Sequence, residues 1–180
     1  VLENMLNAHV DTYHLLKAIP GSEKVKIGLV KNIFQFDPLR RWHLLDWAFS
    51  KILNDVYTNA PLEFLKTGKS SFYMPGMVDN EMLNPEAPGT LDFIGLNYYS
   101  RMHVKGRLNP EEPFVFDTRQ QDIMTDMGYP LYAEGFYRAL KTISDVGVPI
   151  YVTENGLADD KDNVRPLFIE RYLYALNQAL

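Results

Sequence analysis

An alternation of helix-like segments with short strands that are apolar on both faces is the feature that most constrains the fold. Apolar residues recur at helical spacing over four segments, which predicts helices at residues 1–17, 44–56, 132–146 and 165–180. Three short apolar or β-branched runs between them predict strands at residues 25–30, 91–99 and 149–153. Such strands, separated by helices, indicate an α/β fold in which a buried parallel sheet is covered by helices.

Two closures of that sheet fit the pattern. One is an open doubly wound sheet, and the other is part of a (β/α)8 barrel, which typically takes about 250 residues. Three strands cannot close a barrel. The chain has 180 residues, a length typical of one domain, so we treat residues 1–180 as a single domain. Residues 59–88, rich in Pro, Gly, Asn and Ser, are predicted to be a long connection, and residues 107–121 an exposed loop. Trp42 and Trp47 are expected to pack in the core.

Composition and charge exclude several function classes. The net charge is −5, which argues against a nucleic-acid binder with a basic footprint. The sequence has no Cys and no H-x-x-H or H-E-x-x-H pattern, so no metal site is expected, and no G-x-G-x-x-G motif indicates nucleotide binding. No apolar run is long enough for a membrane span. Without Cys or a visible signal peptide we expect a cytoplasmic location, and the absence of an initiator Met suggests an excised piece.

Polar side chains gather where two of the predicted strands end. One strand ends in Asn97, Tyr98, Tyr99 and Ser100, and the other ends in Thr153, Glu154 and Asn155. In parallel α/β folds the carboxyl ends of the strands face the active site. The period of two puts Asn97 and Tyr99 on one face and Tyr98 on the other. Hydrogen bonds from that face would hold the Glu154 carboxylate ionised and oriented. Packing of Tyr99 and a capping role for Glu154 are the structural alternative.

The amino-acid sequences of these segments resemble motifs of a known family. D-F-I-G-L-N-Y-Y-S at residues 92–100 and P-I-Y-V-T-E-N-G at residues 149–156 are similar to two motifs of glycoside hydrolase family 1, the β-glucosidase family. The Y-A-E-G-F-Y segment at residues 132–137 resembles the entry to the helix that precedes the nucleophile strand. The resemblance covers essentially the whole chain. It implies a partial (β/α)8 TIM barrel, from about the fourth helix to the seventh helix of the family barrel.

The resemblance also implies roles for individual residues. Glu154 would be the catalytic nucleophile, Tyr99 the tyrosine that hydrogen-bonds it, and Asn97 a polar neighbour. Asn155 and Tyr98 are further candidates for contacts with the substrate. The implied reaction is retaining hydrolysis of a small-molecule β-glycoside, without metal or organic cofactor, because two carboxyl groups and water suffice.

The family's N-E-P motif, which carries the acid/base, does not occur here. Glu134 could be proposed as the second carboxylate, but its place in a first helical turn favours a capping role. The resemblance therefore implies a fragment, inactive alone, that needs the rest of the barrel or another copy of the chain as a partner. The alternative hypothesis is a non-catalytic barrel fragment or module that binds sugar or a partner chain without hydrolysis.

Overall fold

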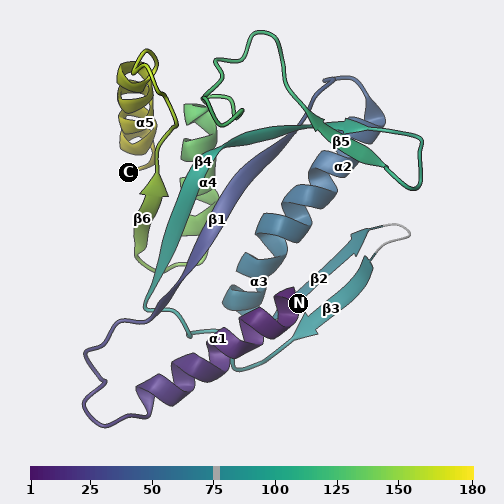
Figure 1. Ribbon diagram of the computed structural model, residues 1–180. Helices are drawn as coiled ribbons and strands as arrows, with labels where there is room; N and C mark the ends of the chain where they lie inside the picture. Colours follow the sequence, from purple (N-terminus) through teal and green to yellow (C-terminus); the bar gives the residue numbers. More distant parts are fainter. Residues whose placement is uncertain (75–77) are drawn as a thin grey trace.

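A long strand, β4 (Phe93–Gly106), organises the sheet in the computed structural model, which describes residues 1–74 and 78–180 (Figure 1). The strands β1 (Gly28–Pro38) and β6 (Ile150–Asn155) run parallel to β4 along its two edges. The short strand β5 (Phe114–Asp117) pairs antiparallel with the far end of β4. The three predicted strands are therefore parallel neighbours as expected, although β1 begins three residues later than predicted and continues to Pro38, and β5 makes the complete sheet mixed.

The four predicted helices are present, with additions after the second one. The helical elements are α1 (Leu2–Lys17), α2 (Leu44–Asn54), the π-helical turn η1 (Asp55–Asn59), α3 (Ala60–Thr67), α4 (Ala133–Ser144) and α5 (Arg165–Ala179). Figure 1 shows α4 behind β4 and β1, with α5 beyond β6. None of the helices in the described ranges is both long enough and apolar enough to cross a bilayer.

The core lies between one face of the sheet and the helices. Alternate residues of β4 (Ile94, Leu96 and Tyr98) are completely buried on that side. Aromatic rings continue this layer, because Phe136 on α4 and Tyr172 on α5 stack with centroids 5.5 Å apart. The intervening residues of β4 project from the opposite face. This arrangement leaves Asn97 and Tyr99 on the face that the helices do not cover.

The prediction of a long connection at residues 59–88 is wrong. The segment contains α3 and an antiparallel hairpin, β2 (Lys69–Met74) and β3 (Val78–Leu83); residues 75–77 lie outside the described part of the chain. Pro61 in the first turn of α3 and Gly68 in the left-handed conformation after it delimit the helix in the usual way. Within the predicted loop at 107–121, β5 is a second element that the prediction missed.

Two predictions of burial are also wrong. The strand β6 was expected to be buried, but five of its six residues are exposed, because it lies at an edge of the sheet. Trp42 and Trp47 were expected in the core, but their exposed fractions are 95% and 57%. The indole N–H of Trp47 donates to the carbonyl of Arg41, which satisfies its polar atom at the surface.

Candidate active site

The hydroxyl of Tyr99 donates a hydrogen bond of 2.7 Å to Oε2 of Glu154. The two residues meet because β4 and β6 are parallel neighbours, with Asn97 in register with Glu154. The hydrogen bond to Glu154 raises the pKa of Tyr99, so the phenol stays protonated and remains a donor. Within the described residues, no group donates to Oε1. This oxygen of the exposed carboxylate is therefore available to an incoming electrophile.

The ends of the two strands are joined by further side-chain contacts. The hydroxyl of Thr153 donates to Oδ1 of Asn97 at 2.6 Å, and the amide of Asn155 donates to the Tyr98 carbonyl at 2.7 Å. Gly95 permits this closeness, since a Cβ there would lie 3.0 Å from the Thr153 hydroxyl oxygen. Glu154 is thus flanked by two residues that are bound to the neighbouring strand, which fixes the position of its backbone.

Tyr98 lies on the opposite face, as the strand period predicts. Its side chain is completely buried, and its hydroxyl donates to the Tyr132 carbonyl at 2.8 Å. This position does not support the assignment of Tyr98 to substrate contacts. The ring instead packs against Phe136 and Tyr172. The Tyr172 hydroxyl donates to the Tyr99 carbonyl at 2.9 Å, so α5 supports the strand that carries Tyr99 from behind.

A cavity of about 610 Å³ is lined by Tyr99, the hydrogen-bond partner of Glu154, and by Asn155, the residue after it; Glu154 itself is not among the lining residues. Its remaining lining residues, from the sheet, two loops and α5, are Asn32, Phe34, Thr125, Met127, Tyr129, Leu131, Gly156, Leu157, Ala158, Phe168 and Tyr172. Phe34 and Tyr129 face each other with centroids 5.5 Å apart. A larger hollow of about 1160 Å³ lies between α3 and the β2–β3 hairpin and contains none of the predicted site residues. Aromatic walls with a few polar groups are typical of sites for small organic ligands.

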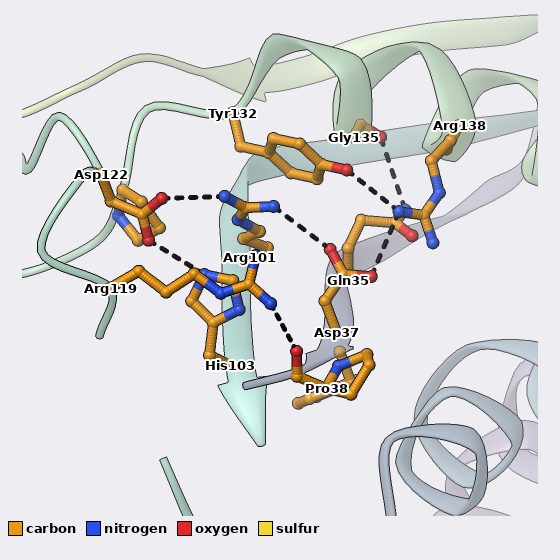
Figure 2. Close-up of polar contacts among 12 residues, drawn as sticks. Gln35, Asp37, Pro38, Arg101, His103, Arg119, Asp122, Tyr132, Gly135 and Arg138 are labelled. Atoms are coloured by element: carbon orange, nitrogen blue, oxygen red, sulfur yellow. Dashed lines mark hydrogen bonds and ion pairs between the residues drawn. The ribbon is translucent and has the colours of Figure 1, made fainter. Parts of the chain in front are cut away.

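Beyond Tyr99, β4 carries a polar network that Figure 2 shows in detail. Asp122 accepts hydrogen bonds of 2.9 Å from Arg101 and from Nε2 of the buried His103. Because a carboxylate only accepts, Nε2 carries the proton of the imidazole. Burial lowers the pKa of His103, and the charge of Arg101 lowers it further, so the ring is neutral near pH 7. The Arg101 guanidinium also lies 4.0 Å from the centroid of Tyr132 (Figure 2).

Sequence reasoning located Tyr99, Glu154, Asn97 and Asn155 together at the strand ends, and the structure brings them together. It missed the support from Thr153 and Tyr172, although Thr153 directly precedes Glu154. No set of three or more His, Asp or Glu side chains among residues 1–74 and 78–180 is grouped in a way that could hold a metal ion.

Comparison with known proteins identifies the family to which this arrangement belongs. The model of glycosyl hydrolase family 1 matches residues 1–179. The chain belongs to this family. Among family 1 proteins, it is 27% identical over 201 residues to a β-galactosidase of Pyrococcus woesei, covering 98% of this chain and 39% of that protein. It is 30% identical over 176 residues to β-glucosidase A of Thermotoga maritima, covering 88% of this chain and 37% of that protein.

Solved structures of family 1 glycosidases agree with the fold. A β-glycosidase from Pyrococcus horikoshii superposes with a TM-score of 0.79 at 30% identity, over 99% of this chain and 40% of that one. A Thermotoga maritima β-glucosidase in complex with glucoimidazole gives a TM-score of 0.78 at 24% identity, over 98% and 43%. The family 1 chain described here therefore spans well under half the length of these relatives, and its fold is a part of their α/β architecture.

Proposed function

We propose that this chain carries the nucleophile half of a retaining β-glycosidase site, with Glu154 as the nucleophile. The observation that carries the proposal is the 2.7 Å hydrogen bond from Tyr99 to Glu154 at the ends of adjacent parallel strands, in a family 1 chain. One oxygen of Glu154 is oriented by Tyr99, and the other would attack the anomeric carbon. The bond to the leaving oxygen breaks as that oxygen is protonated, and water then cleaves the glycosyl ester to release the sugar.

The proton donor in this proposal comes from outside these 180 residues. A retaining mechanism needs a second carboxyl group about 5–5.5 Å from the nucleophile. The sequence has no N-E-P motif, and the chain covers 39% of one relative and 37% of another. We therefore propose that residues 1–180 form a single incomplete (β/α)8 barrel, from about its fourth to its seventh helix. The rest of a barrel would supply the acid/base, and the chain alone would not turn over a glycoside.

The proposed substrates are β-linked glucosides or galactosides. The support is that matched relatives are named as a β-galactosidase and a β-glucosidase. The aromatic and amide groups around the 610 Å³ cavity, among them Tyr129 and Asn155, suit a ligand that presents both apolar faces and hydroxyl groups. The proposed chemistry uses no metal or organic cofactor, because two carboxyl groups and water complete both steps.

The test is covalent trapping with 2,4-dinitrophenyl 2-deoxy-2-fluoro-β-glucoside, followed by intact mass and peptide mapping. Dinitrophenolate leaves without protonation, so the reagent needs the nucleophile and a sugar site but no acid. The chain is treated alone and after co-expression with the part of Thermotoga maritima β-glucosidase A that lies outside the matched region. We expect one 2-deoxy-2-fluoroglucosyl group on Glu154 in the co-expressed sample.

Two variants make the test specific. Glu154→Gln keeps the size of the side chain but removes the nucleophile, so it should abolish labelling. Glu134→Gln, at an exposed carboxylate in the first turn of α4, should label like the unmodified chain. Labelling at another residue, or of the Glu154→Gln variant, would contradict the assignment. A co-purifying, folded complex that binds glucose but shows no adduct would favour the non-catalytic, sugar-binding alternative.

A further inference from the structure

One wall of the cavity beside Tyr99 is an irregular loop, in which an isolated antiparallel bridge pairs Met124 with Pro130. Residues 122–131, here called the wall loop, contribute four of the lining side chains: Thr125, Met127, Tyr129 and Leu131. A tight turn shapes the tip, because the amide of Thr125 donates to the Tyr129 carbonyl at 2.8 Å. These internal bonds shape the loop, and its contacts with the rest of the fold determine where it lies against the cavity.

The first tie is Asp122, at the start of the wall loop. Its carboxylate accepts hydrogen bonds from Arg101 and His103, which follow Tyr99 on the same strand (Figure 2). Only 6% of the Asp122 side chain is exposed. Burial alone would raise the pKa of Asp122, but the hydrogen bond from His103 and the charge of Arg101 outweigh it and lower the pKa. The carboxylate therefore stays charged near neutral pH, and this end of the loop is fixed to β4.

The second tie is Asp126, and it reaches the other functional strand. The Asp126 amide donates to the Ala158 carbonyl at 3.0 Å, and the Asp126 carboxylate accepts from the Asp160 amide at 2.6 Å. Ala158 and Asp160 belong to the segment that leaves β6 immediately after Glu154 and Asn155. These two reciprocal bonds, here called the Asp126 clasp, join the wall loop to the segment that follows the nucleophile.

The segment on the far side of the clasp is itself well held. The Asp159 carboxylate accepts from the amides of Val164 and Arg165 at 2.7 and 2.9 Å, at the beginning of α5. The Arg165 guanidinium in turn donates to the Asp159 carbonyl at 3.2 Å. Because this segment is anchored to α5, the clasp ties the wall loop to a fixed point.

The cavity is lined by Tyr99 and Asn155 but not by Glu154 itself, so it lies beside the reacting carboxylate, where the leaving group of a bound glycoside would extend. We propose that Asp126 is a positioning residue of the glycosidase site: it fixes the wall loop against the segment after Glu154 and so sets how tightly the cavity holds the leaving group. The inference rests on the proposed function, because it assumes that a glycoside is attacked by Glu154. Asp126 contacts Ala158 and Asp160 and makes no hydrogen bond to Glu154, whose position β4 already fixes through Tyr99 and the Asn155 contact. The clasp therefore affects binding and leaves the attack itself unchanged.

The test compares two trapping reagents on the co-expressed complex, with the inhibition constant KI and the first-order labelling rate measured separately. One reagent carries a dinitrophenyl leaving group, which is large enough to contact the walls of the cavity. The other carries fluoride, which is too small to reach them. We expect Asp126→Ala to raise KI for the dinitrophenyl reagent about fivefold, the usual effect of one lost hydrogen bond. KI for the fluoride reagent and both labelling rates should change by less than about twofold.

The matched variants separate positioning from general destabilisation. Asp126→Asn retains a carbonyl oxygen that accepts from the Asp160 amide, so it should restore the KI of the unmodified complex. Asp11→Ala, at an exposed aspartate on α1, controls for loss of charge. Hydrogen exchange of the chain without sugar adds a second readout, in which the Asp160 amide should exchange faster in Asp126→Ala and normally in Asp126→Asn.

The outcomes separate this inference from the proposed function. If the unmodified complex is not labelled, the proposed function fails, and the role given to Asp126 fails with it. If labelling occurs on Glu154 but Asp126→Ala leaves KI and the Asp160 exchange rate unchanged, the positioning role is wrong and the proposed function stands. An equal rise of KI for both reagents would also overturn the inference, because it would place the effect on the sugar and not on the leaving group.

Discussion

Lys31 is expected to destabilise the folded chain, and replacing it with Met should reveal by how much. It lies on β1, in register with the buried Leu96 of β4, so its side chain points toward the helices. Its ammonium donates to the Asn32 carbonyl at 2.7 Å and lies 3.9 Å from the centroid of Tyr57. Neither group is a carboxylate, and among the described residues no ion pair includes Lys31. Burial of this charge lowers the pKa of Lys31 to about 8.

The size and the sign of the effect follow from that pKa. A fall from the ordinary value of 10.5 to about 8 corresponds to about 3 kcal/mol between the two protonation states. The folded pKa lies below the unfolded one, so below pH 8 both states are charged and the folded state carries the whole desolvation cost. As pH rises from about 8 to 10.5 the folded chain loses the proton first and the cost disappears. Stability therefore rises through this window.

Lys31→Met retains an unbranched apolar stem and removes the charge. We expect the free energy of unfolding to increase by about 2–3 kcal/mol near pH 7 and by less than about 1 kcal/mol near pH 10. Urea unfolding followed by circular dichroism at both pH values measures the difference, and Lys24→Met, at an exposed lysine, is the matched control. A variant less stable than the unmodified chain near pH 7, or a gain that does not depend on pH, would refute the reasoning.

Two further predictions concern Asp46 and Tyr99. The fully buried Asp46 carboxylate accepts hydrogen bonds from the exposed Arg40 and from the Gly106 amide. Asp46→Ala leaves that amide without its acceptor, so it should lower the free energy of unfolding by about 2 kcal/mol near neutral pH, measured by urea unfolding. Burial opposes ionisation, but these hydrogen bonds outweigh it and hold the pKa of Asp46 well below its usual range, so the difference should shrink as pH falls below about 4. Tyr99→Phe removes the hydrogen-bond donor to Glu154 and should slow labelling by 2-deoxy-2-fluoro-β-glucosides at least about tenfold, because hydrogen bonds to charged groups are strong. An unchanged labelling rate would show that Tyr99 does not act on the nucleophile.

Much of the fold could be predicted because helix and strand periods are local properties of the sequence. The predicted helices over residues 1–17, 132–146 and 165–180 correspond to α1, α4 and α5 within a few residues. The failure at residues 59–88 came from treating Pro and Gly as loop signals. Pro61 and Gly68 are instead the first-turn and terminating residues of a short helix. The helix α3 has eight residues and the strand β5 has four, and elements this short do not show a clear period.

The site was predictable for a different reason: the carboxyl ends of parallel neighbours meet at one edge of a sheet. This placed Glu154 beside Asn97 and Tyr99 before any distance was known, and the strand period separated Tyr98 from them. The Asp126 clasp could not be predicted, because it joins two loops that are 34 residues apart through the Asp160 amide. Contacts between irregular segments depend on the path of each loop, which no period specifies.

The strand β6 links the fold to the proposed function. Its sequence is typical of a buried strand, yet Tyr151 is 59% exposed, and Val30 on the same face of the sheet is 50% exposed. Glu154 is exposed on this strand as well. A charged nucleophile is more effective in a site from which water is excluded and replaced by fixed dipoles. Strands that completed the proposed barrel would therefore have two effects. They would bury the apolar side chains that face away from the helices, and they would enclose Glu154 in the site where it would react.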